Sequence, residues 1–159
     1  MNQPWFSFVV PGAPVPKARG RTVRPKGQKV RTITPKTTVN FEATVRLVAA
    51  SARPAHWPLR CEYKVEIHAV RAHRGRGDNS NIAKAVEDAC NTVLWADDAQ
   101  IADLHVTRAL DVDNPRTEVR VTALSVACEK CRVQTLYPVE KRCHDCALAL
   151  AAKRARRAS

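Results

Sequence analysis

The sequence predicts an α+β fold: a mixed β-sheet with two main helices, followed by a small C-terminal zinc ribbon. Three observations support this prediction. Segments with alternating apolar and polar residues, typical of half-buried strands, occur beside segments whose apolar residues recur at helical spacing. The elements follow in the order strand, helix, strand, helix, strand, strand, which indicates an α+β or mixed-sheet domain. Two closely spaced pairs of cysteines lie near the end of the chain.

The length and composition limit the organisation of the chain. Its 159 residues suffice for one domain and a short appendage, so we expect a domain over residues 1–126 and a zinc module with a basic helix over residues 127–159. No apolar run of about 18 residues is present to cross a membrane. The first ten residues lack the charged and apolar regions of a signal peptide. We therefore expect a cytoplasmic protein.

The formal net charge of +12 favours a polyanionic partner, and nucleic acid is the commonest one. No acidic residue precedes Glu42. An acidic membrane surface would instead require a basic amphipathic helix with bulky apolar anchors, and none is obvious. For any single Lys or Arg, the alternative to a role in binding is an ordinary solvated surface charge. The residues that we expect to contact DNA lie in three clusters of one sign: Lys17, Arg19, Arg21, Arg74, Arg76, Lys153, Arg154, Arg156 and Arg157.

The first half of the predicted domain contains a strand, a loop and a helix. Residues 5–10 are a short apolar run that ends at Pro11-Gly12, as a first strand would. Residues 11–36 are rich in Pro, Gly, Lys and Arg and predict a long irregular loop. Thr37 or Thr38 is expected to cap a helix that runs to about Ala52.

Three strands are predicted in the rest of the domain. Residues 59–70 alternate regularly, so Cys61 and its apolar neighbours should face the core. Residues 101–109 form the next expected strand. Residues 117–126 alternate again and form the last one. A loop over residues 71–80 and a turn over residues 111–115 connect these elements.

A helix over residues 81–92 is expected to carry two different faces. Asp78, Ser80 and Asn81 are all suitable N-cap residues. At about 100° per residue, the apolar residues form one stripe, whereas the polar residues line another face. The simplest interpretation of the polar face is solvation, with Lys84 and Asp88 as an i,i+4 ion pair. The apolar stripe consists of Ile82, Ala85, Val86, Ala89 and Val93, and the polar face of Asn81, Lys84, Asp88 and Asn91.

The adjacent Asp97 and Asp98 follow this helix and concentrate negative charge in a basic protein. Hard divalent cations bind oxygen ligands and assist phosphodiester cleavage. Asp78 and Asp98 would meet if the loop after the helix returned the chain to a strand beside the helix start. The alternative is a simple turn, in which aspartate is common.

These residues resemble the RusA family of Holliday junction resolvases. The family carries the motif D-x-D-N-x-x-K, an acidic helix end, and W-x-D-D-x-Q-[IV]. The three parts of this pattern resemble, in the same order, residues 78–84, Asp88 and residues 95–101. Residues 14–21 and 34–37 resemble phage members, and the similarity covers roughly residues 5–126.

The resemblance implies a homodimeric, magnesium-dependent endonuclease that makes paired nicks in four-way DNA junctions, with manganese as a possible substitute. Asp78, Lys84 and Asp98 match the catalytic positions. The candidate metal ligands are Asp78, Ser80, Asn81, Asp88, Asp97 and Asp98. Ser80 departs from the family because it replaces the second motif aspartate. One alternative is therefore a DNA-binding protein with weakened catalysis, and another is a zinc-ribbon adaptor that docks on another protein.

The four clustered cysteines have the spacing of a structural zinc site. Two C-x-x-C pairs hold zinc tetrahedrally through four thiolates, and a closed set of ligands leaves no catalytic position. An iron–sulfur cluster or redox disulfides are the alternatives. The segment between the pairs contains few apolar residues, so metal binding would supply most of its folding free energy. The four residues are Cys128, Cys131, Cys143 and Cys146.

Overall fold

The computed structural model describes residues 5–18, 20–23, 29, 31–55, 57–75, 78–124, 126–127, 134–135 and 152–154. Its centre is a four-stranded sheet with the strand order β1-β6-β4-β5. β6 pairs antiparallel with both β1 and β4, whereas β4 and β5 are parallel. The predicted mixed sheet and α+β class are confirmed. The strands are β1 (Trp5–Pro11), β4 (Glu62–Arg71), β5 (Ile101–Leu110) and β6 (Arg116–Leu124).

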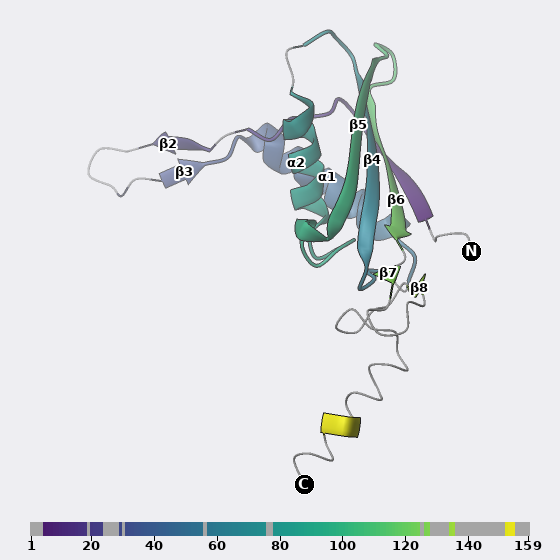
Figure 1. The fold of residues 1–159 in the computed structure, drawn as a ribbon. Coiled ribbons are helices and arrows are strands. Elements are labelled where there is room, and N and C mark those ends of the chain that lie inside the picture. Colours follow the sequence, from purple (N-terminus) through teal and green to yellow (C-terminus); the bar gives the residue numbers. More distant parts are fainter. Residues whose placement is uncertain are drawn as a thin grey trace.

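Both long helices, α1 (Lys36–Ala52) and α2 (Asn79–Cys90), lie on the same side of this sheet (Figure 1). The alternation of the strands turns one set of side chains toward the helices. The predicted apolar stripe on and just after α2 is buried. Cys61 is a core residue as expected. The core between the layers includes Phe8, Val10, Phe41, Val45, Val65, Ile67, Val86, Val119 and Val121.

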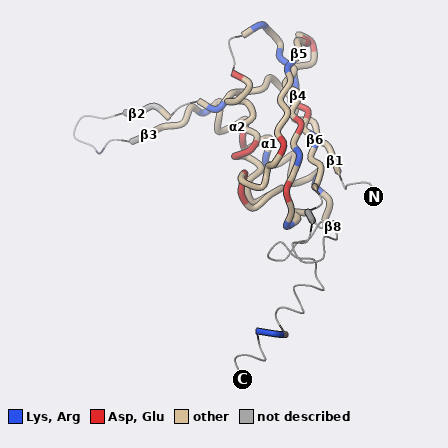
Figure 2. The backbone as a smooth tube through the Cα atoms, viewed as in Figure 1, with Lys and Arg blue, Asp and Glu red and all other residues tan. Residues whose placement is uncertain are grey.

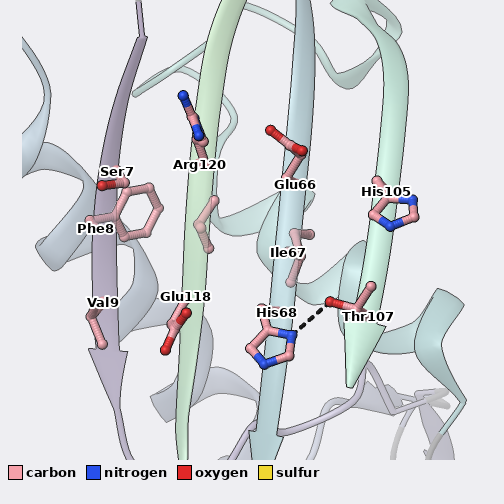
Figure 3. A pocket seen from close by; sticks show the side chains of 11 residues that line it. Ser7, Phe8, Val9, Glu66, Ile67, His68, His105, Thr107, Glu118 and Arg120 are labelled. Atoms are coloured by element: carbon pink, nitrogen blue, oxygen red, sulfur yellow. Dashed lines mark hydrogen bonds between the residues drawn. The ribbon is translucent and has the colours of Figure 1, made fainter. Parts of the chain in front are cut away.

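The opposite face of the sheet carries polar and charged side chains from all four strands (Figure 3). It forms a hollow of about 400 Å³ in which acidic and basic residues are mixed. His68 Nδ1 lies 2.7 Å from Thr107 Oγ1 within this hollow. Among the described residues, none of the site residues predicted from the sequence lines it.

The segment between β1 and α1 differs from the irregular loop that the sequence predicts. It contains a pair of short antiparallel strands, β2 (Arg21–Val23) and β3 (Arg31–Ile33), which project away from the sheet (Figure 1). Three-residue strands are too short to show an alternating pattern. The start of α1 also differs: the N-cap is Pro35, without a side-chain cap, and Thr38 is buried instead of capping.

The strand predicted over residues 59–70 begins later, at Glu62, although Leu59 is buried. The hydroxyl of Tyr63 accepts a hydrogen bond from the Leu59 N–H at 2.7 Å. It also donates one to the Leu59 carbonyl at 2.8 Å. Because both backbone groups of Leu59 bond to a side chain, this residue does not join the sheet.

The C-terminal part is described only at β7 (Val126–Ala127), β8 (Gln134–Thr135) and residues 152–154, which are helical. The zinc ribbon predicted on Cys128, Cys131, Cys143 and Cys146 lies outside the described residues. In the portion of the chain that the structure describes, no helix has the length and apolar character needed to span a bilayer.

Candidate active site

The first part of the candidate site is the start of α2, where Asp78 is the N-cap. Its carboxylate accepts a hydrogen bond from the Ser80 N–H at 3.1 Å. Hydrogen bonds from Ser80 lower the pKa of this carboxyl, and the positive charge of Arg108 adds to the effect. Asp78 is therefore anionic and exposed at the amino end of a 12-residue helix.

The second part is the loop that returns the chain from α2 to β5. Trp95 is fully buried, and its carbonyl accepts a hydrogen bond from the Thr92 N–H at 2.7 Å. Thr92 has a φ of 66°, in the left-handed region that lets the chain reverse. Asp97 caps the short helix η1 (Asp98–Gln100) by accepting from the Ala99 N–H at 2.9 Å. This reversal brings Asp98 back beside α2.

Gln100 holds the same loop in place, a role that the sequence did not reveal. Its side-chain oxygen accepts from the Ala96 N–H at 2.7 Å, and its amide donates to the Cys61 carbonyl at 2.9 Å. One side chain therefore joins the reversal to the segment before β4. The glutamine of the motif supports the loop that presents Asp98.

Lys84 is the meeting point of the acidic residues in this region. Its ammonium group contacts both the Asp98 carboxylate and Asp88 Oδ1, the latter at 3.0 Å. Glu87 Oε2 lies farther away, at 3.9 Å. The i,i+4 pair expected on the polar face is present, but Asp98 extends it to the next element. Acidic residues gather along α2 and the segment that follows it (Figure 2).

Lys17 extends these contacts to the N-terminal loop and α1. Its ammonium group lies 2.9 Å from Asp88 Oδ2 and 2.6 Å from Glu42 Oε1. Its backbone N–H also donates to the Asn81 carbonyl at 2.7 Å. The basic loop is thus fixed along the polar face of α2. We call the alternating series Glu42, Lys17, Asp88, Lys84 and Asp98 the ion-pair network.

The contacts among Lys84, Asp88 and Asp98 keep these three side chains charged. Asp98 first and Asp88 second raise the pKa of Lys84 well above its usual value. The hydrogen bond from Lys84 lowers the pKa of Asp98. Burial acts to raise the pKa of Asp88, but the hydrogen bonds from Lys17 and Lys84 outweigh it and the net shift is downward. Burial raises the pKa of Glu87.

The donor set suits a hard divalent cation. Carboxylate oxygens of Asp98 and Asp88 converge on one positively charged group, the ammonium of Lys84. Oxygen ligands of this kind are the ones that Mg²⁺ prefers. Within the described residues, no three side chains of His, Cys, Asp or Glu are grouped closely enough to form a complete metal site. Two carboxylates and the ammonium group are therefore the observed core of the site.

The remaining predicted residues are spread over several parts of the chain. Ser80 and Asn81 are exposed in the first turn of α2, and Arg74 is exposed in the loop after β4. Lys153 and Arg154 are exposed in the C-terminal helical turn, and the backbone of Arg21 lies in β2. The predicted DNA contacts outside the described residues are Arg19, Arg76, Arg156 and Arg157.

We expect Lys17→Met to lower the free energy of unfolding by about 1 kcal/mol at neutral pH, since two partly exposed ion pairs are lost. The pKa of Asp88 is depressed in the folded state, so its contribution is present above the unfolded pKa and is lost as pH falls through the folded pKa. The difference between the two proteins should therefore shrink in acid. Urea unfolding at pH 7 and at acid pH measures it.

Lys64→Met is the matched control, because the partly exposed Lys64 makes longer ion pairs, 3.4 Å to Glu66 and 3.9 Å to Asp103. Its effect should be smaller than that of Lys17→Met. A loss at Lys17 that stayed constant with pH would attribute the effect to packing of the aliphatic stem rather than to the Asp88 pair.

Comparison with known proteins shows that a family model matches the part of the chain that contains these residues. The model of the family described as endodeoxyribonuclease RusA matches residues 11–122, which include the whole ion-pair network. The chain is also similar to the uncharacterized protein YqaN of Bacillus subtilis (strain 168). The two are 30% identical over 140 residues, which cover 76% of this chain and 97% of YqaN.

Proposed function

The chain belongs to the RusA family of endodeoxyribonucleases, and from that premise we propose that it hydrolyses phosphodiester bonds in branched DNA. The substrate we propose is the four-way Holliday junction, cut by paired nicks in the presence of magnesium. The observation that carries this proposal is the convergence of Asp98 and Asp88 on Lys84 beside a basic loop.

Asp98 and Asp88 would hold the magnesium ion, and Asp78, Asp97, Ser80 and Asn81 are further candidate ligands. When bound, the ion would polarise the scissile phosphate and lower the pKa of a water molecule. Lys84 would leave its carboxylate partners and bind a non-bridging phosphate oxygen, where its charge offsets the charge that develops during cleavage.

Ser80 favours a second candidate function, a junction-binding protein with weakened catalysis. A serine supplies an oxygen but no negative charge in place of the motif aspartate. We expect Asp88, about two turns farther along α2, to supply negative charge to the site, since one of its oxygens already contacts Lys84. Tight binding of a junction without any nicking, in magnesium or manganese, would instead favour the second candidate.

The test of the main proposal compares a labelled four-way junction with a linear duplex of the same sequence. Purified protein should nick two opposing strands of the junction when magnesium is present. It should leave the junction intact in EDTA. The linear duplex should be cut at least about tenfold more slowly. Equal cutting of both DNAs would contradict branch selectivity, although it would retain a nuclease.

We also propose a homodimer, because paired nicks in a junction require two active sites and two-fold symmetry is the commonest arrangement of subunits. The basic loop with Lys17 supports DNA binding near the site, since it lies along α2. Lys17, Arg19, Arg21, Arg74 and Arg76 would contact backbone phosphates, with a strong dependence on salt. The C-terminal basic residues would extend this contact.

The four clustered cysteines would bind a structural zinc ion, which the chemistry of four thiolates supports. Purified protein is expected to contain about one zinc ion per chain by mass spectrometry of metals. Cys143→Ser combined with Cys146→Ser should lose it, whereas Cys61→Ala, a change in the core, should keep it. Iron in place of zinc, or retention of zinc by the double variant, would overturn this assignment.

A further inference from the structure

A separate basic pocket of about 380 Å³ lies at one end of the sheet, where β4 and β5 finish. Arg71 closes β4, and Arg108 lies near the end of β5. The Asp111 N–H donates to the Arg71 carbonyl at 2.8 Å, which ties the two strand ends together. The pocket is lined by Arg71, His73, Arg74, Gly75, Arg108, Ala109 and Leu110.

The chemistry of this pocket fits an anion with an apolar neighbour. Three guanidinium groups and an imidazole line it, and none of the described residues in the lining is acidic. Guanidinium groups match phosphate oxygens through paired hydrogen bonds. Ala109 and Leu110 add an apolar wall, and the side chain of Leu110 is half exposed. The volume far exceeds the ~30 Å³ of one water molecule, so a phosphodiester with part of its sugar has room.

The loop that carries Arg74 orders this pocket and leads toward the active site. Arg71 Nη1 donates to the Gly75 carbonyl at 3.1 Å, and the Gly75 N–H donates to the His73 carbonyl at 2.9 Å. Three residues after Gly75 the chain reaches Asp78 at the start of α2. Arg108 also acts electrostatically on Asp78, which places the pocket near that end of the candidate site.

We propose that this pocket binds a backbone phosphodiester of the DNA at the same time as Lys84 engages the scissile phosphate. This rests on the proposed nuclease function and adds a second point of attachment, with Arg71 and Arg108 as binding residues that sequence reasoning did not select. Two fixed phosphates define the direction of the strand, whereas a single one leaves it free to rotate. The pocket therefore positions the strand that is cut.

The test measures junction binding in EDTA at a series of salt concentrations, with the full chain. Each phosphate contact contributes about 0.9 to the slope of log K against log salt on duplex DNA. Arg108→Gln should reduce the slope by about 1 and weaken binding roughly tenfold at low salt. Arg74→Gln should act in the same direction and serves if Arg108→Gln folds poorly. Addition of inorganic phosphate tests whether a free anion competes for the pocket. The added phosphate should weaken junction binding by the wild type more than junction binding by Arg108→Gln.

Arg120→Gln is the matched control, since it removes the same charge from the sheet face opposite the helices. There the Arg120 guanidinium carbon lies 4.1 Å from the centroid of the Trp5 ring. Its slope should equal that of the wild type. Unchanged slopes for both pocket variants, in a preparation that still cuts junctions with magnesium, would overturn the pocket alone. A reduced slope in a protein that binds but never cuts would uphold the pocket and refute the nuclease. Absence of DNA binding by the wild type would refute both.

Discussion

Asp98→Asn is expected to lower the rate of junction cleavage by about 10³-fold while leaving junction affinity within about threefold. The substitution keeps the size of the side chain but removes the negative charge that faces Lys84. Loss of a carboxylate ligand should weaken transition-state stabilisation by several kcal/mol, and each 1.36 kcal/mol is a factor of ten in rate. Single-turnover cleavage at saturating protein measures the chemical step directly.

Asp103→Asn is the matched control, because Asp103 lies five residues farther along, on β5, and its side chain is 57% exposed. Its cleavage rate should be close to that of the wild type. If Asp98→Asn cut junctions as fast as Asp103→Asn, the carboxylate at position 98 would have no part in catalysis. Circular dichroism of both variants excludes unfolding as the cause of a slow rate.

Trp95→Ala is expected to have the largest effect on stability, a loss of about 3–5 kcal/mol in the free energy of unfolding. The side chain is fully buried, and its ring centroid lies 6.0 Å from that of Tyr63. Its removal would leave a large cavity beneath the reversal that carries Asp97 and Asp98. Cleavage should therefore fall as well, even at temperatures where the protein stays folded. Urea unfolding followed by circular dichroism measures the first effect.

Trp5→Ala provides the comparison, since Trp5 is 54% exposed on β1. It should cost no more than about 1 kcal/mol, because it leaves no internal cavity. Similar losses for the two tryptophan variants would mean that Trp95 does not hold the core as its burial indicates.

The sequence predicted the elements that follow a long and regular pattern. The 3.6-residue period placed Ile82 and Val86 in the core and Lys84 and Asp88 on one polar face, and the structure has both. The period-two pattern likewise gave the core face of β4. Local periodicity is informative here because each pattern repeats several times within one element.

Long-range pairings could not be obtained in this way. Lys17 and Glu42 lie 25 residues apart, and nothing in either segment indicates that the Lys17 ammonium group lies between Glu42 and Asp88. The expectation that Asp78 and Asp98 would converge beside Lys84 depended on the path of one loop. The structure brings Asp98 to Lys84 together with Asp88, whereas the Asp78 carboxylate accepts a hydrogen bond from the Ser80 N–H and interacts electrostatically with Arg108.

Short or competing local signals account for the other differences. Two threonines offered a cap for α1, but burial of Thr38 against the core prevailed over its capping preference. Leu59 continued the alternation of β4, but Tyr63 took its backbone hydrogen bonds. In both cases a tertiary contact overrode a local pattern, which single-sequence reasoning cannot weigh.

The most direct test of the proposed centre is a crystal structure of the protein soaked with Mn²⁺, with anomalous diffraction to locate the ion. We expect a peak within about 2.0–2.3 Å of carboxylate oxygens of Asp98 and Asp88, with the Lys84 ammonium displaced from between them. A fully occupied manganese ion bound elsewhere, with Lys84 still bridging the two carboxylates, would contradict the account.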